Sequence, residues 1–300
     1  MKEGLRFDAL LLDMDGVLLD TRPSFTAAVV LSARRCAAAP GSGPLQDPNW
    51  GEGWGEPEVE ALRLAGGFNN DWDGAAAVAL LGPASGPGAA WASLCKELAA
   101  ARGGPQAVAS RCGEDAWTAM RARVTPVFQC LYAGPRAMEI YGLDPTEPTG
   151  LYALEAPLAT PSEIAAAGLP TGVFTGRARE EATLGLERLG LDLPPERVVC
   201  DTSPRFRKPR PDGLMVLAAA MGSRRPLYVG DTVDDMEAAH NARQAGLEAS
   251  FAGVAGEGTE RARRFKEGGA KAVGDSLRMI LENLGLGSTV PRPAGSGGST

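Results

Sequence analysis

The stretch that decides the fold is residues 9–18, which read ALLLDMDGVL. An apolar run ends there in two aspartates, Asp13 and Asp15, spaced two residues apart. Because the run is short and polar residues bound it, the pattern is typical of a strand buried in a parallel sheet. The two carboxylates would then lie at the carboxyl end of that strand, where open α/β sheets bind ligands. Gly16 lets the chain leave the strand in a conformation that other residues resist.

Two carboxylates this close repel each other, and a hard cation with oxygen ligands offsets the repulsion. The rest of the composition narrows the chemistry, because the chain holds one histidine, His240. Histidine-based triads and histidine-rich metal sites are therefore nearly excluded. Carboxylates and lysine must carry any hydrolytic chemistry.

Charge and hydrophobicity limit the class of partner. The chain has 300 residues, 44% of them hydrophobic, which is enough for one large domain or two small ones. A net charge of −7 without a long basic run argues against a nucleic-acid or anionic-membrane surface. No apolar stretch approaches the length of a membrane span or a signal peptide. Five scattered cysteines indicate reduced thiols, so we expect a cytoplasmic protein.

The pattern of apolar residues changes along the chain. Helical patterns fill residues 21–150, interrupted by Gly/Pro-rich loops at 40–57 and 82–87. Beyond residue 151, apolar runs alternate with helical patterns, which predicts a doubly wound parallel sheet. We therefore expect an α/β core from residues 1–20 and 151–285, a helical domain over 21–150, and a disordered tail over 286–300.

Three more short motifs follow the first along the chain. Thr175 ends an apolar run, Lys208 precedes a proline, and an apolar run leads into Gly230-Asp231-Thr232-Val233-Asp234-Asp235. Each is weak alone, since Lys-Pro is usually a solvated turn and paired aspartates usually cap a helix. In this order they resemble the four motifs of the haloacid dehalogenase superfamily over residues 7–20 and 160–285. The long insert resembles an enlarged version of the helical cap of subfamily I, the phosphoglycolate-phosphatase-like branch.

The resemblance implies a Rossmann-like core with a helical cap inserted after the first strand, and it assigns catalytic roles. Asp13 would be the nucleophile that forms an aspartyl-phosphate, and Asp15 the general acid and base. Thr175 and Lys208 would hold phosphoryl oxygens.

The resemblance also implies a Mg²⁺ site. Asp13 and Asp231 would ligate the ion with their carboxylates, and Asp15 with its backbone carbonyl. Asp235 would orient a metal-bound water, with Asp234 as the alternative.

The implied activity is a Mg²⁺-dependent phosphatase that hydrolyses a small phosphorylated metabolite. Asp15 favours phosphomonoesterases and phosphomutases, because dehalogenases of the superfamily lack a carboxylate there and phosphotransferase pumps carry threonine. A phosphomutase on the same scaffold and a non-catalytic phosphometabolite-binding regulator stay open as alternatives.

Three further residues are candidates for substrate binding. Gly176 and Arg177 directly follow Thr175, and for Arg177 a salt bridge with a neighbouring acid is the alternative. Asn69 lies in the stretch GFNNDW, residues 67–72, which is either a substrate loop or the start of a helix.

Overall fold

The computed structural model describes residues 7–37, 52–68, 70–101 and 103–287. It divides into two compact units: the core unit, Met1–Leu19 with Pro157–Thr300, and the cap unit, Asp20–Ala156. The chain crosses between them within strands β2 (Leu19–Asp20) and β3 (Ala156–Pro157), which form a two-stranded sheet. The domain limits expected from the sequence, 20/21 and 150/151, stay a prediction.

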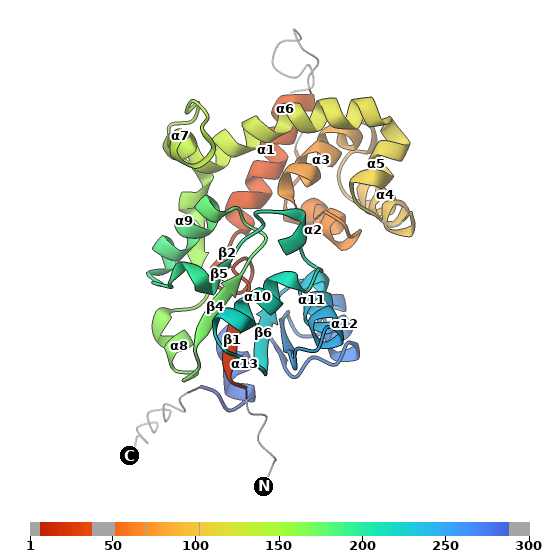
Figure 1. The fold of residues 1–300 in the computed structure, drawn as a ribbon. Coiled ribbons are helices and arrows are strands. Elements are labelled where there is room, and N and C mark those ends of the chain that lie inside the picture. The colour runs from red at the N-terminus through yellow and green to blue at the C-terminus, as the bar shows by residue number, and fades with distance from the viewer. Residues whose placement is uncertain (1–6, 38–51, 69, 102, 288–300) are drawn as a thin grey trace, which may run out of the picture. The chain divides into compact units, whose positions relative to one another are not determined.

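The core unit is built on one parallel sheet with strand order β5-β4-β1-β6-β7-β8 (Figure 1). Its strands are β1 (Ala9–Leu12), β4 (Thr171–Phe174), β5 (Val198–Val199), β6 (Pro226–Gly230), β7 (Ser250–Val254) and β8 (Val273–Gly274). The chain builds the sheet outward from β1 in one direction and then in the other. The predicted doubly wound sheet is therefore confirmed, and its switch point flanks β1.

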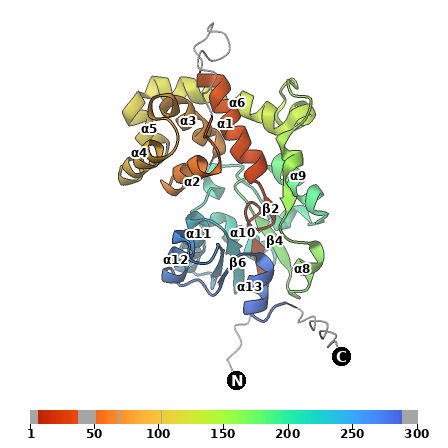
Figure 2. The ribbon, with the colours of Figure 1, turned by 180° about the vertical axis from the view of Figure 1, so that it is seen from behind.

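Helices cover both faces of this sheet. They are α8 (Pro161–Ala165), α9 (Arg179–Leu189), α10 (Asp212–Ala220), α11 (Val233–Gln244), α12 (Glu260–Glu267) and α13 (Leu277–Asn283). Side chains alternate along β1, so Leu10 and Leu12 pack with α8, α9 and α13, whereas Ala9 and Leu11 pack with α10, α11 and α12. Figures 1 and 2 show the two layers from opposite sides.

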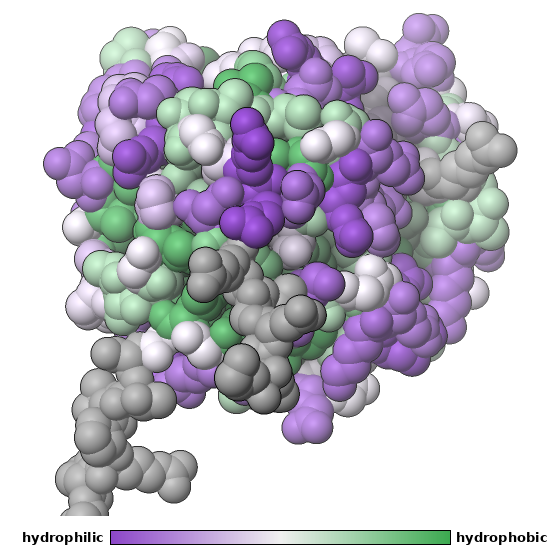
Figure 3. All heavy atoms as spheres, turned by 60° about the horizontal axis from the view of Figure 1, so that its bottom comes forward, coloured by the Kyte–Doolittle hydropathy of each residue, from purple (hydrophilic) through white to green (hydrophobic). Residues whose placement is uncertain are grey.

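The surface of the core unit contrasts with this apolar interior. Figure 3 brings forward the end where α13 lies, and hydrophilic and hydrophobic residues are intermixed over that face. Leu286, placed in the expected disordered tail, packs against the same apolar cluster as α13, because α13 ends only three residues earlier. Residues 288–300 of that tail lie outside the described residues.

The cap unit is helical, as predicted. Its described helices are a π-helical turn η1 (Arg22–Thr26), α1 (Ala27–Ala37), α2 (Glu56–Leu64), α3 (Asp71–Ser85), α4 (Ala89–Ala100), α5 (Gly104–Cys112), α6 (Glu114–Ala133) and α7 (Ala137–Tyr141), with two short 3₁₀ turns, η2 (Gly134–Arg136) and η3 (Leu151–Leu154). None of the helices in the described part of the chain is both long and apolar enough to cross a membrane.

The loop predicted over residues 82–87 is wrong for its first four residues, because α3 continues through Pro83 to Ser85. Pro83 removes the N–H that would bond the Ala79 carbonyl, and the helix ends two residues later at Ser85, with Gly86 as its C-cap at φ of 67°. The presence of glycine at position 82 is explained by packing, since a Cβ there would lie 3.1 Å from the Trp54 ring. The other expected loop, 40–57, falls mostly on residues 38–51, outside the described residues.

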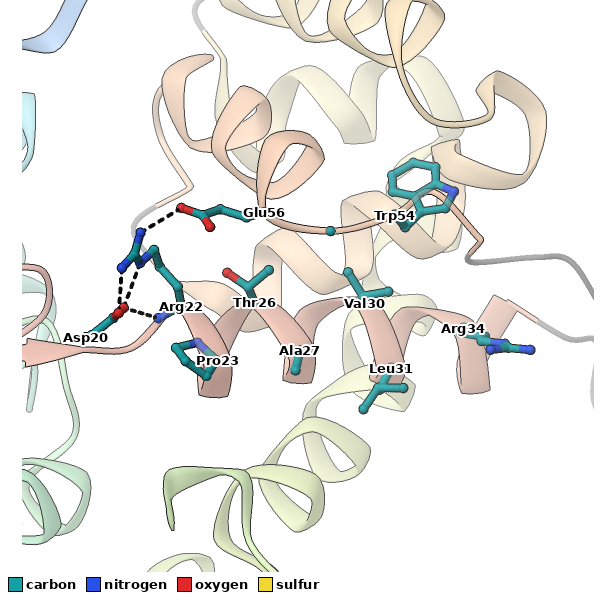
Figure 4. A pocket seen from close by; sticks show the side chains of 11 residues that line it. Asp20, Arg22, Pro23, Thr26, Ala27, Val30, Leu31, Arg34, Trp54 and Glu56 are labelled. Atoms are coloured by element: carbon teal, nitrogen blue, oxygen red, sulfur yellow. Dashed lines mark hydrogen bonds and ion pairs between the residues drawn. The ribbon is translucent and has the colours of Figure 1, made fainter. Parts of the chain in front are cut away.

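The cap unit also contains a cavity of about 610 Å³ between α1 and the segment leading into α2 (Figure 4). Its walls are largely apolar, with Val30, Leu31 and Trp54 among them. At one end Arg22 lies between Asp20, at 2.6 Å, and Glu56, at 3.6 Å. These charges are therefore already paired with one another.

Candidate active site

The register of the sheet brings three of the four sequence motifs together. Leu12 is level with Val173 of β4 and Val229 of β6. Asp13 directly follows Leu12, the last residue of β1. Thr175 directly follows the end of β4, and Asp231 directly follows the end of β6. Because the strands are parallel, these side chains belong to the same edge of the sheet.

Lys208, from the third motif, joins this group through two ion pairs. Its Nζ lies 2.7 Å from Asp13 Oδ1 and 2.7 Å from Asp235 Oδ1. The rings of Phe174 and Tyr228 lie under the ammonium, with centroids at 5.2 and 5.7 Å. Only 10% of the lysine side chain is exposed, so the cation is fixed against the buried carboxylate of Asp13.

The Asp235 carboxylate is fully buried and surrounded by donors. The Tyr228 hydroxyl donates to Oδ1 at 2.6 Å, and the Thr232 hydroxyl and N–H donate to Oδ2 at 2.6 and 2.9 Å. Lys208 supplies the fourth contact. Asp235 therefore caps α11 and holds Lys208 in place.

Burial and mutual repulsion shape the charges of this group. Burial raises the pKa of Asp13 well above its usual value, and Asp235, Asp15 and Asp231 add to the effect while Lys208 opposes it. Burial and Asp235 also raise the pKa of Asp231 to about 7.

The pKa shifts of Lys208 and Asp235 both favour the charged forms of these side chains. Burial alone would lower the lysine pKa, but Asp13 and Asp235 hold it above its usual value. Burial alone would raise the Asp235 pKa, but Lys208, Thr232 and Tyr228 hold it below the usual range. Lys208 and Asp235 thus form an ion pair, whereas Asp13 and Asp231 resist ionisation when no further cation is bound.

The donor set fits a hard divalent cation. One carboxylate oxygen from each of Asp13, Asp231 and Asp235 lies within 4.8 Å of the other two. The backbone of Gly16 approaches closely, because a Cβ there would lie 2.3 Å from Asp231 Oδ2, and its φ of 70° suits glycine. All-oxygen donors of this kind are those that Mg²⁺ prefers. Since both Asp235 oxygens hold protein donors, Asp13 and Asp231 are the better ligands.

The structure brings Thr175, Gly176 and Arg177 to the same edge. Thr175 is fully buried, and its Oγ1 accepts the Arg177 N–H at 3.2 Å. Its O–H makes no donated hydrogen bond within the described ranges, so the proton is available to a ligand. Gly176 is exposed. The Arg177 side chain instead pairs with Asp15, at 2.7 Å from Oδ1.

The remaining candidates differ in outcome. Asn69 lies outside the described residues, and its neighbour Asn70 caps α3 by accepting the Trp72 N–H at 2.8 Å. Asp234 lies on α11, partly buried.

The sequence did not indicate Tyr228 or Arg261, whose Nη1 lies 3.4 Å from Asp231. A tyrosine inside an apolar run was a signal that could have been used. Arg261 lies on α12, and the N-cap residue Thr259 is the sequence signal that could have indicated this helix.

Comparison with known families decides the family of this chain. The model of the haloacid dehalogenase-like hydrolases matches residues 7–243. The chain belongs to this family. The family predicted from the four motifs is therefore confirmed, and so is the hydrolase class.

Solved structures share the fold of this hydrolase at low sequence identity. The phosphatase Tt82 from Thermococcus thioreducens is 23% identical, with 84% of this chain and 94% of that chain covered and a TM-score of 0.57. A haloacid dehalogenase-like hydrolase from Bacteroides fragilis is 15% identical, with 92% and 100% covered and a TM-score of 0.52. A family IA hydrolase from Entamoeba histolytica is 14% identical, with 93% and 98% covered and a TM-score of 0.51. A search of curated proteins finds no match.

Proposed function

We propose that this hydrolase is a Mg²⁺-dependent phosphatase that cleaves a small phosphorylated metabolite through an aspartyl-phosphate on Asp13. The observation that carries the proposal is the pair of contacts made by Lys208, which ties Asp13 to Asp235 at 2.7 Å each. A buried carboxylate next to a fixed ammonium is suited to attack an anionic phosphoryl group, because the ammonium offsets the repulsion between the two anions.

In the first step, an Asp13 carboxylate oxygen attacks phosphorus and the bond from phosphorus to the ester oxygen breaks. Lys208 and the Thr175 hydroxyl stabilise the charge on the equatorial phosphoryl oxygens. The free O–H of Thr175 and the exposed backbone of Gly176 lie beside each other for this purpose. Mg²⁺, held by Asp13, Asp231 and the backbone carbonyl of Asp15, would supply further neutralisation of phosphoryl charge.

Asp15 serves as the acid and then the base. Its proton goes to the leaving alkoxide in the first step. In the second step its carboxylate takes a proton from water as that water attacks phosphorus, and the bond from Asp13 to phosphorus breaks. Phosphate leaves and both aspartates return to their starting forms. Asp15 suits this role because 34% of its side chain is exposed, unlike the buried Asp13.

A relative with this fold supports the choice of phosphoryl chemistry. The Thermococcus thioreducens protein is named a phosphatase. A carboxylate at position 15 agrees with this, since a phosphate ester leaves as an alkoxide that needs a proton.

The test is a turnover screen of the purified chain against a panel of phosphorylated metabolites, with phosphate release measured in Mg²⁺ and after chelation. We expect release from at least one phosphomonoester in Mg²⁺ and none after chelation. Phosphoryl transfer to an acceptor without release to water would favour the mutase instead. Absence of turnover on every ester would favour the binding regulator.

A further inference from the structure

Arg177 and Asp15 form an ion pair in which the two side chains differ in solvent exposure. The arginine side chain is 1% exposed and the aspartate 34%. Nε lies 2.8 Å and Nη2 2.7 Å from the same oxygen, Asp15 Oδ1. Oδ1 therefore accepts a hydrogen bond from Nε and lies in ion-pair contact with Nη2, whereas Oδ2 has no donor among the described residues.

The guanidinium is held by contacts that do not involve Asp15. Nη1 donates to the backbone carbonyl of Glu181, one turn into α9, at 3.3 Å. The Arg177 N–H donates to Thr175 Oγ1 at 3.2 Å, and its carbonyl accepts the Asp201 N–H at 3.0 Å. Gly185 of α9 leaves room for the side chain, because a Cβ there would lie 3.2 Å from Nη1. Contacts within the core unit thus hold the Arg177 side chain in place without Asp15, and Arg177 in turn holds the Asp15 carboxylate.

We propose that Arg177 is a positioning residue, which clamps Oδ1 of Asp15 so that Oδ2 is the oxygen that donates and accepts the proton. The inference rests on the proposed function, in which Asp15 is the acid and base. It replaces the expectation that Arg177 binds substrate, because a side chain with 1% of its surface exposed has almost none to offer a ligand. A planar fork suits the clamp, since both nitrogens reach one oxygen without moving the backbone.

The burial of the two partners decides which variant is informative. Removing the arginine leaves a partly hydrated carboxylate free to move, which disturbs its position more than the fold. Asp15→Asn removes the carboxylate charge and keeps one side-chain oxygen, so it serves as the partner variant. Arg177→Met keeps an unbranched apolar stem and removes the guanidinium. Arg177→Lys keeps the charge on a slightly shorter side chain but offers a single nitrogen, and it serves as the second variant if Arg177→Met does not fold.

The experiment is a double-mutant cycle of Arg177→Met with Asp15→Asn, measured as kcat/KM on an alkyl phosphate and on nitrophenyl phosphate. The value of kcat/KM reports on the steps up to and including departure of the leaving group. In that step the alkoxide of the alkyl ester needs a proton, whereas nitrophenolate needs little protonation. We expect Arg177→Met to lower kcat/KM by about tenfold to a hundredfold on the alkyl ester, as part of the roughly hundredfold or more that acid catalysis supplies. On the aryl ester we expect a change within about threefold.

The cycle also separates a positioning role from substrate binding. If Arg177 acts through Asp15, the double variant should match Asp15→Asn alone within about twofold on the alkyl ester. Arg177→Lys should recover part of the loss. Arg179→Lys, the same change two residues along the chain, should behave as wild type.

Two results would overturn the inference. Equal losses on both esters, or losses that multiply in the double variant, would mean that Arg177 binds the shared phosphoryl group, while the proposed function stood. A wild-type enzyme that hydrolyses neither ester in Mg²⁺, or an Asp15→Asn variant with equal losses on both, would refute the role of Asp15 and the inference with it.

Discussion

Asp231→Asn should make the metal-free protein more stable and at the same time inactive. The folded-state pKa of Asp231 is about 7, roughly three pH units above its ordinary value of 3.8, because of burial and the neighbouring Asp235. At about 1.4 kcal/mol per pH unit, holding this side chain ionised in the folded protein costs up to about 4 kcal/mol. Asparagine has nearly the same volume and carries no charge, so it removes that cost.

The sign of the pH dependence follows from the raised pKa. Between about pH 4 and pH 7 the folded protein binds a proton at Asp231 that the unfolded chain has released, so metal-free stability falls as pH rises. This is opposite to an aspartate stabilised by a salt bridge. The gain from Asp231→Asn should therefore be about 1.5 kcal/mol at pH 5 and about 4 kcal/mol at pH 8.

The assay is urea denaturation of wild type and Asp231→Asn in chelator at pH 5 and pH 8, repeated with Mg²⁺. Asp192→Asn, the same change at an exposed aspartate of the core unit, is the control and should stay within about 0.5 kcal/mol of wild type. Mg²⁺ at about a hundred times its Kd should stabilise wild type by about 2.7 kcal/mol and Asp231→Asn far less. A variant less stable than wild type at pH 8 in chelator, or a gain that does not grow with pH, would refute the reasoning.

Three shorter predictions concern the acid, the metal and the cap. Asp15→Asn should lower kcat/KM less on nitrophenyl phosphate than on an alkyl phosphate, and equal losses would count against Asp15 as the acid. Ca²⁺ should not replace Mg²⁺ in a phosphate-release assay, because its looser, higher coordination can engage both Asp13 oxygens; full activity in Ca²⁺ would contradict that geometry. Asn69→Ala should lower kcat/KM on the natural substrate from a few-fold to about a hundredfold and leave aryl phosphate hydrolysis and Tm unchanged. A lower Tm with unchanged kinetics would instead make Asn69 part of a helix start.

The sequence predicted the core because its signals there are local. The apolar run before Asp13 must be buried, and parallel strands must end at a common edge, so the meeting of Asp13, Thr175 and Asp231 follows from chain order and strand register. The limits of α9 at 179 and 189 follow equally from a helical pattern closed by Gly190.

Contacts between residues distant in sequence could not be predicted. Arg177 and Asp15 are 162 positions apart, and only the fold decides between the salt bridge and a substrate contact. The donation from Tyr228 to Asp235 depends on how the β6 side chains meet α11. In the cap unit, Pro83 and its neighbouring glycines predict a loop, but α3 continues through Pro83 to Ser85, which local signals do not show.

The central claim is that Asp13 carries the phosphoryl group during turnover. It is tested most directly by acid-quenching the Mg²⁺-loaded enzyme within a single turnover of a phosphomonoester and mapping the phosphorylated peptide by mass spectrometry. The account predicts a phosphoryl group on Asp13 that forms before phosphate is released and disappears as release completes. The matched variant Asp13→Asn should carry none and should lose several orders of magnitude in rate while remaining folded. Substrate hydrolysis with no phosphoryl group on Asp13, or Asp13→Asn turnover near the wild-type rate, would contradict the account.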